Sequence, residues 1–213
     1  MGEASGDRRC VYVVDDDQHM RTSISRLLLV SGYRYRVFES AVAYLNAALE
    51  PCEAACLVLD VRMPELSGIE LQQRLSGSDH DVPIVFVSAH GDIPMAVQTL
   101  KAGAVSFLQK PFDPADLLVA VEEALGKAGR LAEQVSKRSA VQRKYELLSP
   151  REKEVFWKVT QGLLNKQVAA ELGIAEKTVK IHRARVMLKM EATSVAELVR
   201  LSEQCAENAA HAE

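Results

Sequence analysis

Residues 10–17 read Cys-Val-Tyr-Val-Val-Asp-Asp-Asp, a nearly unbroken β-branched and aromatic run that ends in three carboxylates. Such a run is typical of a strand buried on both faces of a parallel sheet. Further runs with strand character follow at 35–38, 56–60, 84–88 and 105–108, each separated from the next by a helical pattern. Alternating strands and helices predict an α/β fold with a parallel sheet between layers of helices.

Helix start and stop signals fill the gaps between these runs. The expected helices run from the capping residue Asp17 to about Gly32, over 41–49 behind Ser40, over 69–75, over 94–102, and onward from Pro114. This spacing fits the smaller doubly wound pattern, a flavodoxin-like five-stranded sheet in the order 2-1-3-4-5. In such a sheet, ligands bind just outside the carboxyl ends of the strands.

Polar side chains stand where the predicted strands end. They are Asp15 and Asp16 after the first strand, Asp60 at the third, Ser88 at the fourth and Lys110 after the fifth. Because parallel strands end at one edge, we expect these groups in a single pocket. Mg²⁺ suits the pocket best, because it takes one or two carboxylates and keeps several waters. We expect Asp16 and Asp60 to bind it directly and Asp15 through water, with a phosphoryl group on Asp60.

The motifs around these residues are similar to the signature set of two-component receiver domains. They are Val-Val-Asp15-Asp16-Asp17, Leu59-Asp60 through Gly68, Val87-Ser88-Ala89-His90-Gly91 and Phe107 through Phe112. The resemblance covers about residues 9–126, and four motifs in order make it specific. It implies that Asp60 accepts a phosphoryl group from the phosphohistidine of a sensor histidine kinase, with Mg²⁺ bound.

The same resemblance implies further roles. The backbone carbonyl of Arg62 would complete the Mg²⁺ shell, and the Lys110–Pro111 bond would be cis. Ser88 and Lys110 would bind the phosphoryl group, and Phe107 would turn inward as Ser88 moves. Ser88 stands where threonine is commoner and Phe107 where tyrosine is common, and both retain the needed function. A degenerate receiver that is never phosphorylated is the alternative interpretation.

A linker is predicted over residues 127–147. The segment 114–147 has no strand signal, and its apolar residues recur at three- and four-residue intervals, at Leu117, Val121, Ala124, Ala128, Leu131 and Val135. This pattern favours a fifth helix that runs on as the linker and pairs with a second copy. Gly126 and Gly129 each weaken a helix by about 1 kcal/mol relative to alanine. A flexible hinge at 126–130 therefore fits the sequence about as well.

A second, all-α domain is predicted over 148–204. Ser149, Pro150 and Glu152 form the start signal of a helix with reciprocal capping. Further helices are expected over 166–172 with Asn165 as the cap, over about 176–190 and over 195–204, followed by a frayed tail at 205–213. A turn at Gly173 between the second and third of these helices indicates a helix-turn-helix unit.

The third of these helices is strongly basic. The first 125 residues carry 18 acidic and 10 basic residues, whereas 177–189 holds five basic residues and no acidic one. At 100° per residue, Val179 and Val186 share an inner face, and Ile181 and Ala184 share an outer face bordered by cations. Such a surface suits a helix that enters the major groove of DNA. A solvated charged face is the alternative.

The segment 147–204 resembles the LuxR-type helix-turn-helix domain, through Leu148–Val155, Gly162, Asn165-Lys166, Ala169, Leu172–Ile174 and Lys177–His182. By that resemblance, base edges would be contacted by Lys180, Ile181 and Ala184. Phosphates would be held by Lys166, Thr178, Arg183 and Arg185. Ala175 departs from the family, because a capping serine is usual there, and Leu188 places a large apolar side chain on the outer face.

Composition sets few further limits. The net charge is −3, and a hydrophobic content of 48% is ordinary for a soluble globular protein. No apolar run approaches the length of a membrane span, and the first nine residues do not resemble a signal peptide. The four cysteines, at positions 10, 52, 56 and 205, lack metal-site spacing, and their use fits a reducing cytosol.

The order of receiver, linker and LuxR-type domain resembles the FixJ and NarL group of response regulators, and the stretch 90–97 looks closer to FixJ. The resemblance implies a cytoplasmic bacterial transcription regulator, not an enzyme, that is phosphorylated on Asp60. Its expected partners are a sensor histidine kinase, double-stranded promoter DNA, RNA polymerase and a second copy, and no membrane. The homodimer would form through 94–102, 105–108 and 114–125. The competing readings are a constitutive DNA-binding protein with a non-switching receiver, and a phosphate sink or relay.

Overall fold

The computed structural model describes residues 9–49, 52–76, 82–89 and 93–210. The chain divides into two compact units, with the boundary between Ala132 and Glu133, and each unit is described by itself. Part of the stretch 90–97, which resembles FixJ, lies outside the described residues.

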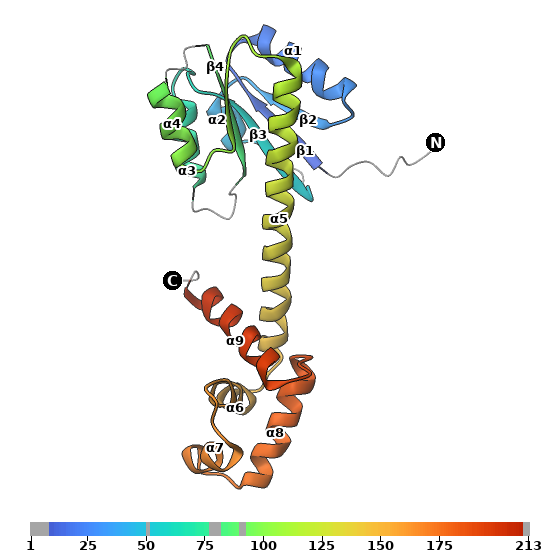
Figure 1. Cartoon of the computed structure of the whole chain (residues 1–213), viewed down its shortest axis with the longest axis vertical. Helices are drawn as coiled ribbons and strands as arrows, with labels where there is room; N and C mark the ends of the chain where they lie inside the picture. Colours follow the sequence, from blue (N-terminus) through green and yellow to red (C-terminus); the bar gives the residue numbers. More distant parts are fainter. Residues whose placement is uncertain (1–8, 50–51, 77–81, 90–92, 211–213) are drawn as a thin grey trace, which may run out of the picture. The chain divides into compact units, whose positions relative to one another are not determined.

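The first unit is built on a five-stranded parallel sheet (Figure 1). Its strands are β1 (Arg9–Val14), β2 (Arg34–Phe38), β3 (Ala54–Asp60), β4 (Ile84–Ser88) and β5 (Ser106–Gln109). Their order is β2-β1-β3-β4-β5, and every pairing is parallel. The predicted doubly wound α/β fold is therefore confirmed.

Helices cover both faces of this sheet. They are α1 (Gln18–Val30), α2 (Ala41–Leu45), α3 (Gly68–Leu75), α4 (Ile93–Lys101) and α5 (Pro114–Glu146). Successive residues of β1 enter different apolar clusters, because side chains alternate between the faces of a strand. Val13 packs in the cluster that holds Leu28 and Leu117 of α1 and α5, whereas Val14 packs in the cluster that holds Leu71 of α3. This alternation fixes the register that brings the strand ends together.

Helix α2 is shorter than the predicted segment 41–49. The Ser40 hydroxyl caps it as expected, since it accepts a hydrogen bond from the Ala43 N–H at 3.1 Å. The helix nevertheless ends at Leu45. The carbonyl of Ala48 instead accepts a hydrogen bond from Arg36 of β2 at 2.8 Å, which holds this backbone against the edge strand.

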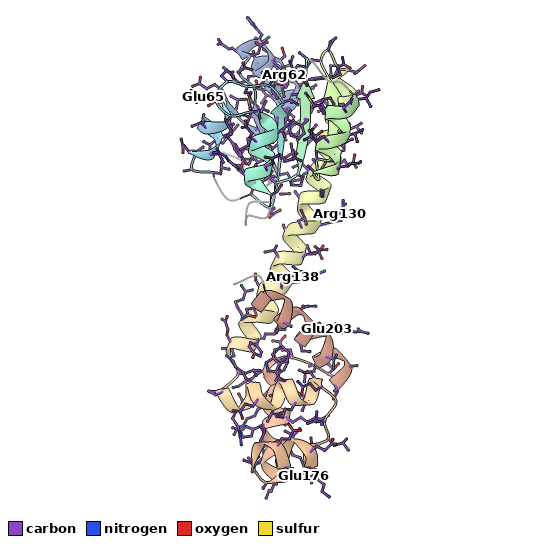
Figure 2. The ribbon with its side chains drawn as sticks, turned by 90° about the vertical axis from the view of Figure 1, so that its left-hand side faces the viewer. Arg62, Glu65, Arg130, Arg138, Glu176 and Glu203 are labelled. Carbon is purple, nitrogen blue, oxygen red and sulfur yellow. The ribbon has the colours of Figure 1, made fainter. Side chains whose placement is uncertain are left out.

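Helix α5 is continuous from Pro114 to Glu146, so the structure has a helix rather than a hinge at 126–130. Ala124, Leu125 and Ala128 are buried around the two glycines, and this packing offsets the low helix propensity of glycine. Residues 132–139 are exposed within this chain, and charged side chains such as Arg138 line that stretch (Figure 2). Pairing of α5 with a second copy stays a prediction.

The second unit contains the end of α5 followed by α6 (Pro150–Thr160), α7 (Asn165–Leu172), α8 (Glu176–Lys189) and α9 (Val195–Ala210). The predicted capping box opens α6: the Ser149 N–H donates to Glu152 at 2.8 Å, and the Glu152 N–H donates to the Ser149 hydroxyl. The core is apolar and includes Val155, Phe156, Val179, Met190 and Leu198. This all-α unit agrees with the predicted fold class.

Two predicted details of the second unit are wrong. Leu164, not Asn165, is the N-cap of α7, and its N–H donates to the Gln167 side chain at 2.8 Å. The predicted end of the last helix at 204 is also too early, because Cys205 is buried in the core and α9 continues to Ala210. Among the residues that the structure describes, no helix is both long and apolar enough to cross a membrane.

Candidate functional site

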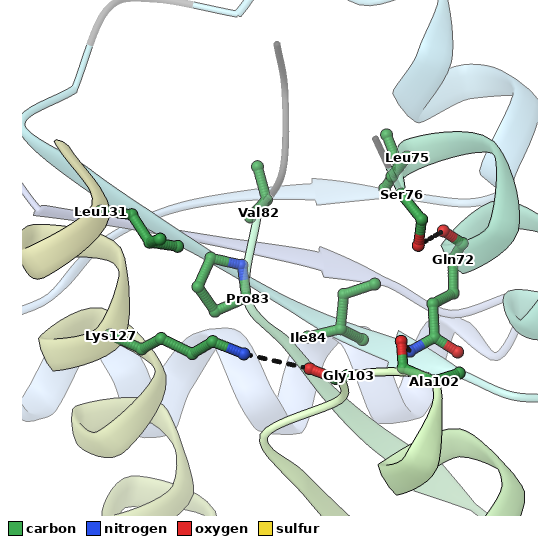
Figure 3. A pocket seen from close by; sticks show the side chains of 10 residues that line it. All are labelled: Gln72, Leu75, Ser76, Val82, Pro83, Ile84, Ala102, Gly103, Lys127 and Leu131. Atoms are coloured by element: carbon green, nitrogen blue, oxygen red, sulfur yellow. Dashed lines mark hydrogen bonds between the residues drawn. The ribbon is translucent and has the colours of Figure 1, made fainter. Parts of the chain in front are cut away.

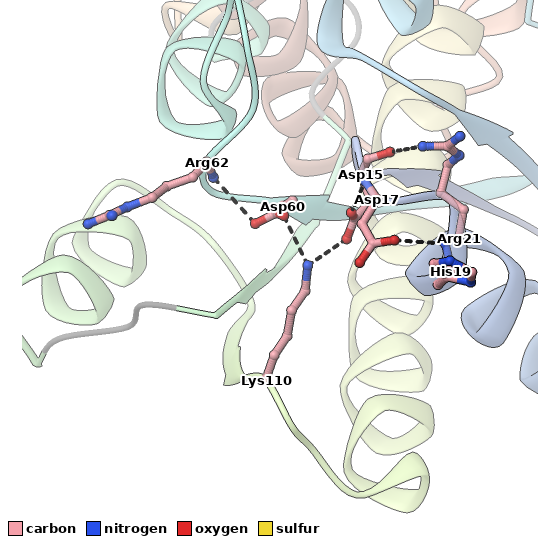
Figure 4. A network of polar contacts seen from close by, with 7 residues as sticks. All are labelled: Asp15, Asp17, His19, Arg21, Asp60, Arg62 and Lys110. Atoms are coloured by element: carbon pink, nitrogen blue, oxygen red, sulfur yellow. Dashed lines mark hydrogen bonds and ion pairs between the residues drawn. The ribbon is translucent and has the colours of Figure 1, made fainter.

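The predicted acidic residues lie together at the carboxyl ends of β1 and β3. Carboxylate oxygens of Asp15, Asp16 and Asp60 all lie within 4.8 Å of one another. Asp15 is fully buried and Asp60 is 7% exposed, whereas Asp16 is exposed. Lys110, just after β5, donates from Nζ to Asp15 Oδ2 at 2.6 Å and to Asp60 Oδ2 at 2.9 Å (Figure 4). Residues from the ends of three strands therefore build one pocket.

Backbone groups hold the two buried carboxylates in place. The Asp17 N–H donates to Asp15 Oδ1 at 2.9 Å, and the Arg62 N–H donates to Asp60 Oδ1 at 3.3 Å. The side chain of Arg62 points away from the pocket (Figure 4). Arg62 therefore contributes its backbone to this site, and the role predicted for its carbonyl stays a prediction.

Burial and pairing act in opposite directions on the charged groups. Burial raises the pKa of Asp15, although hydrogen bonds from Lys110 and from the Asp17 N–H oppose that rise. Burial alone would lower the pKa of Lys110, but its hydrogen bonds to Asp15 and Asp60 outweigh burial and raise it. Lys110 is therefore a permanent cation that offsets part of the carboxylate charge.

The donor set fits a divalent cation. Three carboxylates meet one ammonium, which leaves negative charge in excess, and Asp16 faces solvent, where an ion and its waters have access. Oxygen donors of this kind are the ligands that Mg²⁺ prefers. The residues present can therefore hold Mg²⁺ through Asp15, Asp16 and Asp60.

The remaining predicted residues of this site lie on β4 and β5. Ser88 is buried at the end of β4, and its carbonyl accepts the Lys110 N–H at 2.8 Å. Phe107 is half-buried, lies opposite Phe86 in the sheet and packs against the apolar cluster on the α3 side. The Lys110–Pro111 bond is cis, as the resemblance implied. A backbone hydrogen bond thus couples Ser88 directly to Lys110.

Two supporting residues were missed by the sequence analysis. Arg21 donates from Nη1 to the backbone carbonyl of Asp15 at 2.6 Å and so fastens the end of β1 to α1. A Cβ atom on Gly68 would lie 2.2 Å from the carbonyl oxygen of Asp60, so this position requires glycine. Gly68 closes the motif that contains Asp60 and was detectable there, whereas Arg21 carries no signal of its own in the sequence.

A separate cavity of about 270 Å³ lies at the amino end of β4. It is lined by Gln72, Leu75, Ser76, Val82, Pro83, Ile84, Ala102, Gly103, Lys127 and Leu131 (Figure 3). Lys127 donates to the Gly103 carbonyl at 3.2 Å, and Gln72 donates to the carbonyls of Thr99 and Ala102. None of the predicted site residues lines this cavity, so it is not part of the candidate site.

In the second unit, the two faces of α8 are as predicted. Val179, Val186 and Met190 are buried in the core. The outer face exposes Lys180, Ile181, Ala184, Arg185 and Leu188. Lys166 on α7 is also exposed, and Thr178 is half-buried. Leu188 is 77% exposed, which agrees with its predicted position on the outer face.

Contacts around α8 refine the predicted roles of three residues. Arg183 donates to the Asn165 side chain at 2.9 Å, so this predicted phosphate ligand already binds α7. Lys180 Nζ lies 3.3 Å from a carboxylate oxygen of Glu176, the first residue of the helix. Ala175 is the N-cap and provides no side-chain hydrogen bond. The start of α8 therefore lacks the cap that is usual in the family.

Models of two protein families match the chain. The family described as "Response regulator receiver domain" matches residues 11–122, and the family described as "Bacterial regulatory proteins, luxR family" matches residues 146–202. Response regulator protein TmoT of Ectopseudomonas mendocina is 46% identical over 194 residues, which cover 91% of this chain and 88% of TmoT. Nodulation protein W of Bradyrhizobium diazoefficiens is 46% identical over 203 residues, which cover 95% and 89% of the two chains.

Solved structures agree with these matches. The response regulator StyR superposes with a TM-score of 0.79 at 43% identity, over 92% of this chain and 98% of StyR. Full-length FixJ from B. japonicum gives a TM-score of 0.53 at 41% identity, over 93% of this chain and 97% of FixJ. The chain therefore belongs to the two-component response regulators that combine a receiver domain with a LuxR-type DNA-binding domain, a family of transcription regulators rather than enzymes.

Proposed function

We propose that this chain is a phosphorylation-dependent regulator of transcription in the bacterial cytoplasm, and that Asp60 accepts its phosphoryl group from the phosphohistidine of a sensor histidine kinase. The observation that carries this proposal is the pocket of Asp15, Asp16, Asp60 and Lys110 at the carboxyl edge of the sheet. A phosphoacceptor carboxylate needs a metal ion and a fixed cation beside it. Asp15 and Asp16 are placed to hold the metal ion with Asp60, and Lys110 is the cation.

Asp15, Asp16, Asp60 and the backbone carbonyl of Arg62 would hold Mg²⁺. Bound there, Mg²⁺ would offset the charge on the carboxylates and on the transferred phosphoryl oxygens. A carboxylate oxygen of Asp60 attacks phosphorus, the phosphorus–nitrogen bond to histidine breaks, and the imidazole takes up a proton. Lys110 then donates to a phosphoryl oxygen instead of to the carboxylate oxygens. The new contact is a charge-assisted hydrogen bond, which is stronger than a neutral one.

The added phosphoryl group would change the face built by α4, β5 and α5. Ser88 binds a phosphoryl oxygen, and Phe107 turns into the space that Ser88 leaves. Within this chain the face exposes apolar side chains: Ile93 is 81% exposed, Leu100 44% and Val119 70%. If a second copy covered these side chains, their apolar surface would leave water, and this burial would stabilise a dimer. We therefore expect phosphorylation to produce a homodimer through this face.

The dimer would place two DNA-binding units on promoter DNA, where RNA polymerase also binds. Lys180, Ile181 and Ala184 would contact base edges. Phosphates would be contacted by Lys166, Thr178, Arg183 and Arg185. One unit alone binds weakly and with strong salt dependence, whereas two linked units gain effective concentration. Phosphorylation at Asp60 would thereby control affinity for paired half-sites.

The experiment that tests this proposal is sedimentation of the full chain with Mg²⁺, with and without beryllofluoride, which stands in for the phosphoryl group. We expect a shift from monomer to dimer in the wild type and no shift in Asp60→Asn. Asp113→Asn is a matched control, because Asp113 is exposed and caps the Ala115 N–H, which asparagine can also do. The same dimer in every sample would favour a constitutive DNA-binding protein with a non-switching receiver.

A further inference from the structure

Helix α4 is packed only lightly on the receiver. All nine of its residues are described, and only Thr99 among them is buried. Ile93 and Leu100 are 81% and 44% exposed. Nine residues are fewer than an isolated helix needs to be stable in water. The position of α4 therefore depends on a small number of specific contacts.

The C-terminal end of α4 is held by side chains from two other helices (Figure 3). Gln72 of α3 donates from Nε2 to the backbone carbonyls of Thr99 and Ala102, at 3.3 and 3.2 Å. Lys127 of α5 donates to the backbone carbonyl of Gly103 at 3.2 Å. The last carbonyls of a helix lack partners inside the helix, so these two side chains cap α4 from outside.

Hydrogen bonds, rather than close apolar packing, fix this end of α4. Gln72, Ala102, Gly103 and Lys127 all line the cavity of about 270 Å³, so the space beside their contacts is not filled by side chains. Leu71, the residue before Gln72, is by contrast fully buried in the apolar cluster on the α3 side of the sheet. Gln72 is therefore the point at which α3 holds the end of α4.

Gln72 is a buried polar side chain whose hydrogen bonds are made on one side only. It is 3% exposed. Because both of its acceptors are carbonyls, the amide nitrogen must face them and Oε1 must face away. Oε1 is also buried, and no group among the described residues donates to it. A buried acceptor without a donor lowers stability. An apolar residue would avoid that loss, but it could not hold α4.

Helix α3 connects this contact to the predicted phosphoacceptor. A Cβ atom on Gly68, the first residue of α3, would lie 2.2 Å from the Asp60 carbonyl oxygen, so no side chain fits between them. Gln72 follows one turn later. Ser67 closes a complete capping box at the start of α3. At its end, Ser76 donates both its N–H and its hydroxyl to the Gln72 carbonyl, each at 2.9 Å. A short helix that is capped at both ends moves as one body.

We propose that α3 is a route from Asp60 to the face built by α4, β5 and α5, and that Gln72 is the positioning residue at the end of this route. The proposal rests on the proposed function and adds a path that does not pass through Ser88 and Phe107. A phosphoryl group on Asp60 would shift its backbone, and the close approach of Gly68 would pass that shift to α3. Gln72 would then move the C-terminal end of α4.

The test follows amide hydrogen exchange of the full chain in Mg²⁺, with and without beryllofluoride. Fluorine NMR establishes that beryllofluoride is bound, and dilution until sedimentation shows monomers keeps a dimer interface from covering α4. The reporters are the N–H groups of Ala102, Gly103 and Ala104, which donate to carbonyls of α4. We expect beryllofluoride to change their exchange rates in the wild type. Gln72→Met keeps the length of the side chain but has no donor, and should shrink this response by about 2- to 30-fold.

Two further variants separate the α3 route from general loosening of the receiver. Gln73→Met is the matched control, because Gln73 is the next residue of α3 and is exposed, and it should keep the wild-type response. Lys127→Met removes the other contact with the end of α4 and should also keep the response, because Lys127 lies on α5. Gln72→Leu replaces Gln72→Met if the methionine variant does not fold.

The proposal is overturned if Gln72→Met responds as the wild type does, or if the end of α4 does not respond in the wild type. It is also overturned if Lys127→Met loses as much of the response as Gln72→Met. If fluorine NMR finds no bound beryllofluoride, the proposed function falls together with the α3 route. If the end of α4 responds through Gln72 but no dimer forms at higher concentration, the α3 route stands and only the proposed dimer fails.

Discussion

A Cβ atom on Gly68 would lie 2.2 Å from the backbone carbonyl oxygen of Asp60, so the first residue of α3 lies directly against the predicted phosphoacceptor. The Gly68 N–H also donates to the Val61 carbonyl at 3.0 Å. Ser67 caps the helix with a complete capping box, which fixes where α3 begins. The position of Asp60 therefore depends on how α3 starts.

Gly68→Ala is expected to destabilise the first unit by about 1–3 kcal/mol, because the backbone of Asp60 or of α3 must move to admit the methyl group. The same movement should weaken beryllofluoride binding. Urea unfolding followed by circular dichroism measures the first effect. Gly129→Ala is the matched control: nothing lies within 4 Å of its new Cβ, and alanine should stabilise α5 by about 0.5–1 kcal/mol. Equal unfolding free energies for the two variants would contradict the prediction.

Much of the receiver could be predicted from the sequence, because the evidence is local. Each buried strand is a short apolar run, and each ends in the polar residue that the pocket uses, as at Asp60 and Ser88. Strand ends in a parallel sheet meet at one edge whatever the details of packing. The gathering of Asp15, Asp16, Asp60 and Lys110 followed from that rule alone.

The features that could not be predicted depend on contacts between distant residues. Asn165 has the chemistry of a cap, but its side chain accepts a hydrogen bond from Arg183, which lies on another helix. The contact of the Tyr12 hydroxyl with Cys52 Sγ, at 3.6 Å, depends on how the segment before β3 lies against β1, and neither residue shows it locally. The extension of α9 to Ala210 likewise depends on the burial of Cys205 in the core of the second unit.

Glu152 should make the second unit sensitive to acid. Its carboxylate accepts a hydrogen bond from Lys189 at 2.6 Å and is 3% exposed. The hydrogen bond from Lys189, helped by those from Ser149 and opposed by burial, lowers the pKa of Glu152 to about 2 from the usual 4.5. The stabilisation is therefore present above about pH 4.5 and is lost as the pH falls toward 2. It is on the order of 2–3 kcal/mol.

Trp157 fluorescence measures this effect, because Trp157 is the single tryptophan of the chain and lies in α6. Glu152→Gln should lower the free energy of unfolding at pH 7. Between pH 5 and pH 3, the free energy of unfolding of this variant should fall less than that of the wild type. Glu154→Gln removes a half-exposed ion pair with Arg151. It should change the free energy of unfolding by less than about 1 kcal/mol. The prediction fails if both variants have the same pH dependence.

Ala175→Ser should stabilise the second unit by about 1 kcal/mol. Ala175 occupies the N-cap of α8 in an extended conformation and provides no side-chain hydrogen bond, so a serine hydroxyl can accept from an unpaired N–H of the first turn. Denaturant unfolding followed by Trp157 fluorescence measures the gain. Ala184→Ser makes the same chemical change inside the helix, where serine is the poorer helix former, and should destabilise by about 0.5 kcal/mol. If Ala175→Ser does not raise the free energy of unfolding, the missing cap of α8 does not limit the stability of the second unit.

Lys180→Ala should reduce sequence discrimination more than Arg185→Ala does. Lys180 lies in the first turns of α8, the part of a recognition helix that contacts base edges, whereas Arg185 is predicted to contact phosphate. Loss of a base contact costs about 1–3 kcal/mol on the preferred site alone. Loss of a phosphate contact weakens binding to all sequences. It also reduces the slope of the logarithm of affinity against the logarithm of salt concentration by about 1.

Binding of the beryllofluoride-treated full chain to a site selected from random DNA, and to scrambled DNA, separates these two outcomes at several salt concentrations. Glu176→Gln should raise affinity for both DNAs, because Lys180 Nζ lies 3.3 Å from the Glu176 carboxylate and would lose a competitor for its charge. Lys137→Ala, on an exposed part of α5 and paired with Glu133, controls for loss of charge outside α8 and should leave both affinities nearly unchanged. Equal losses on both DNAs for Lys180→Ala would place Lys180 on the phosphates instead of the bases.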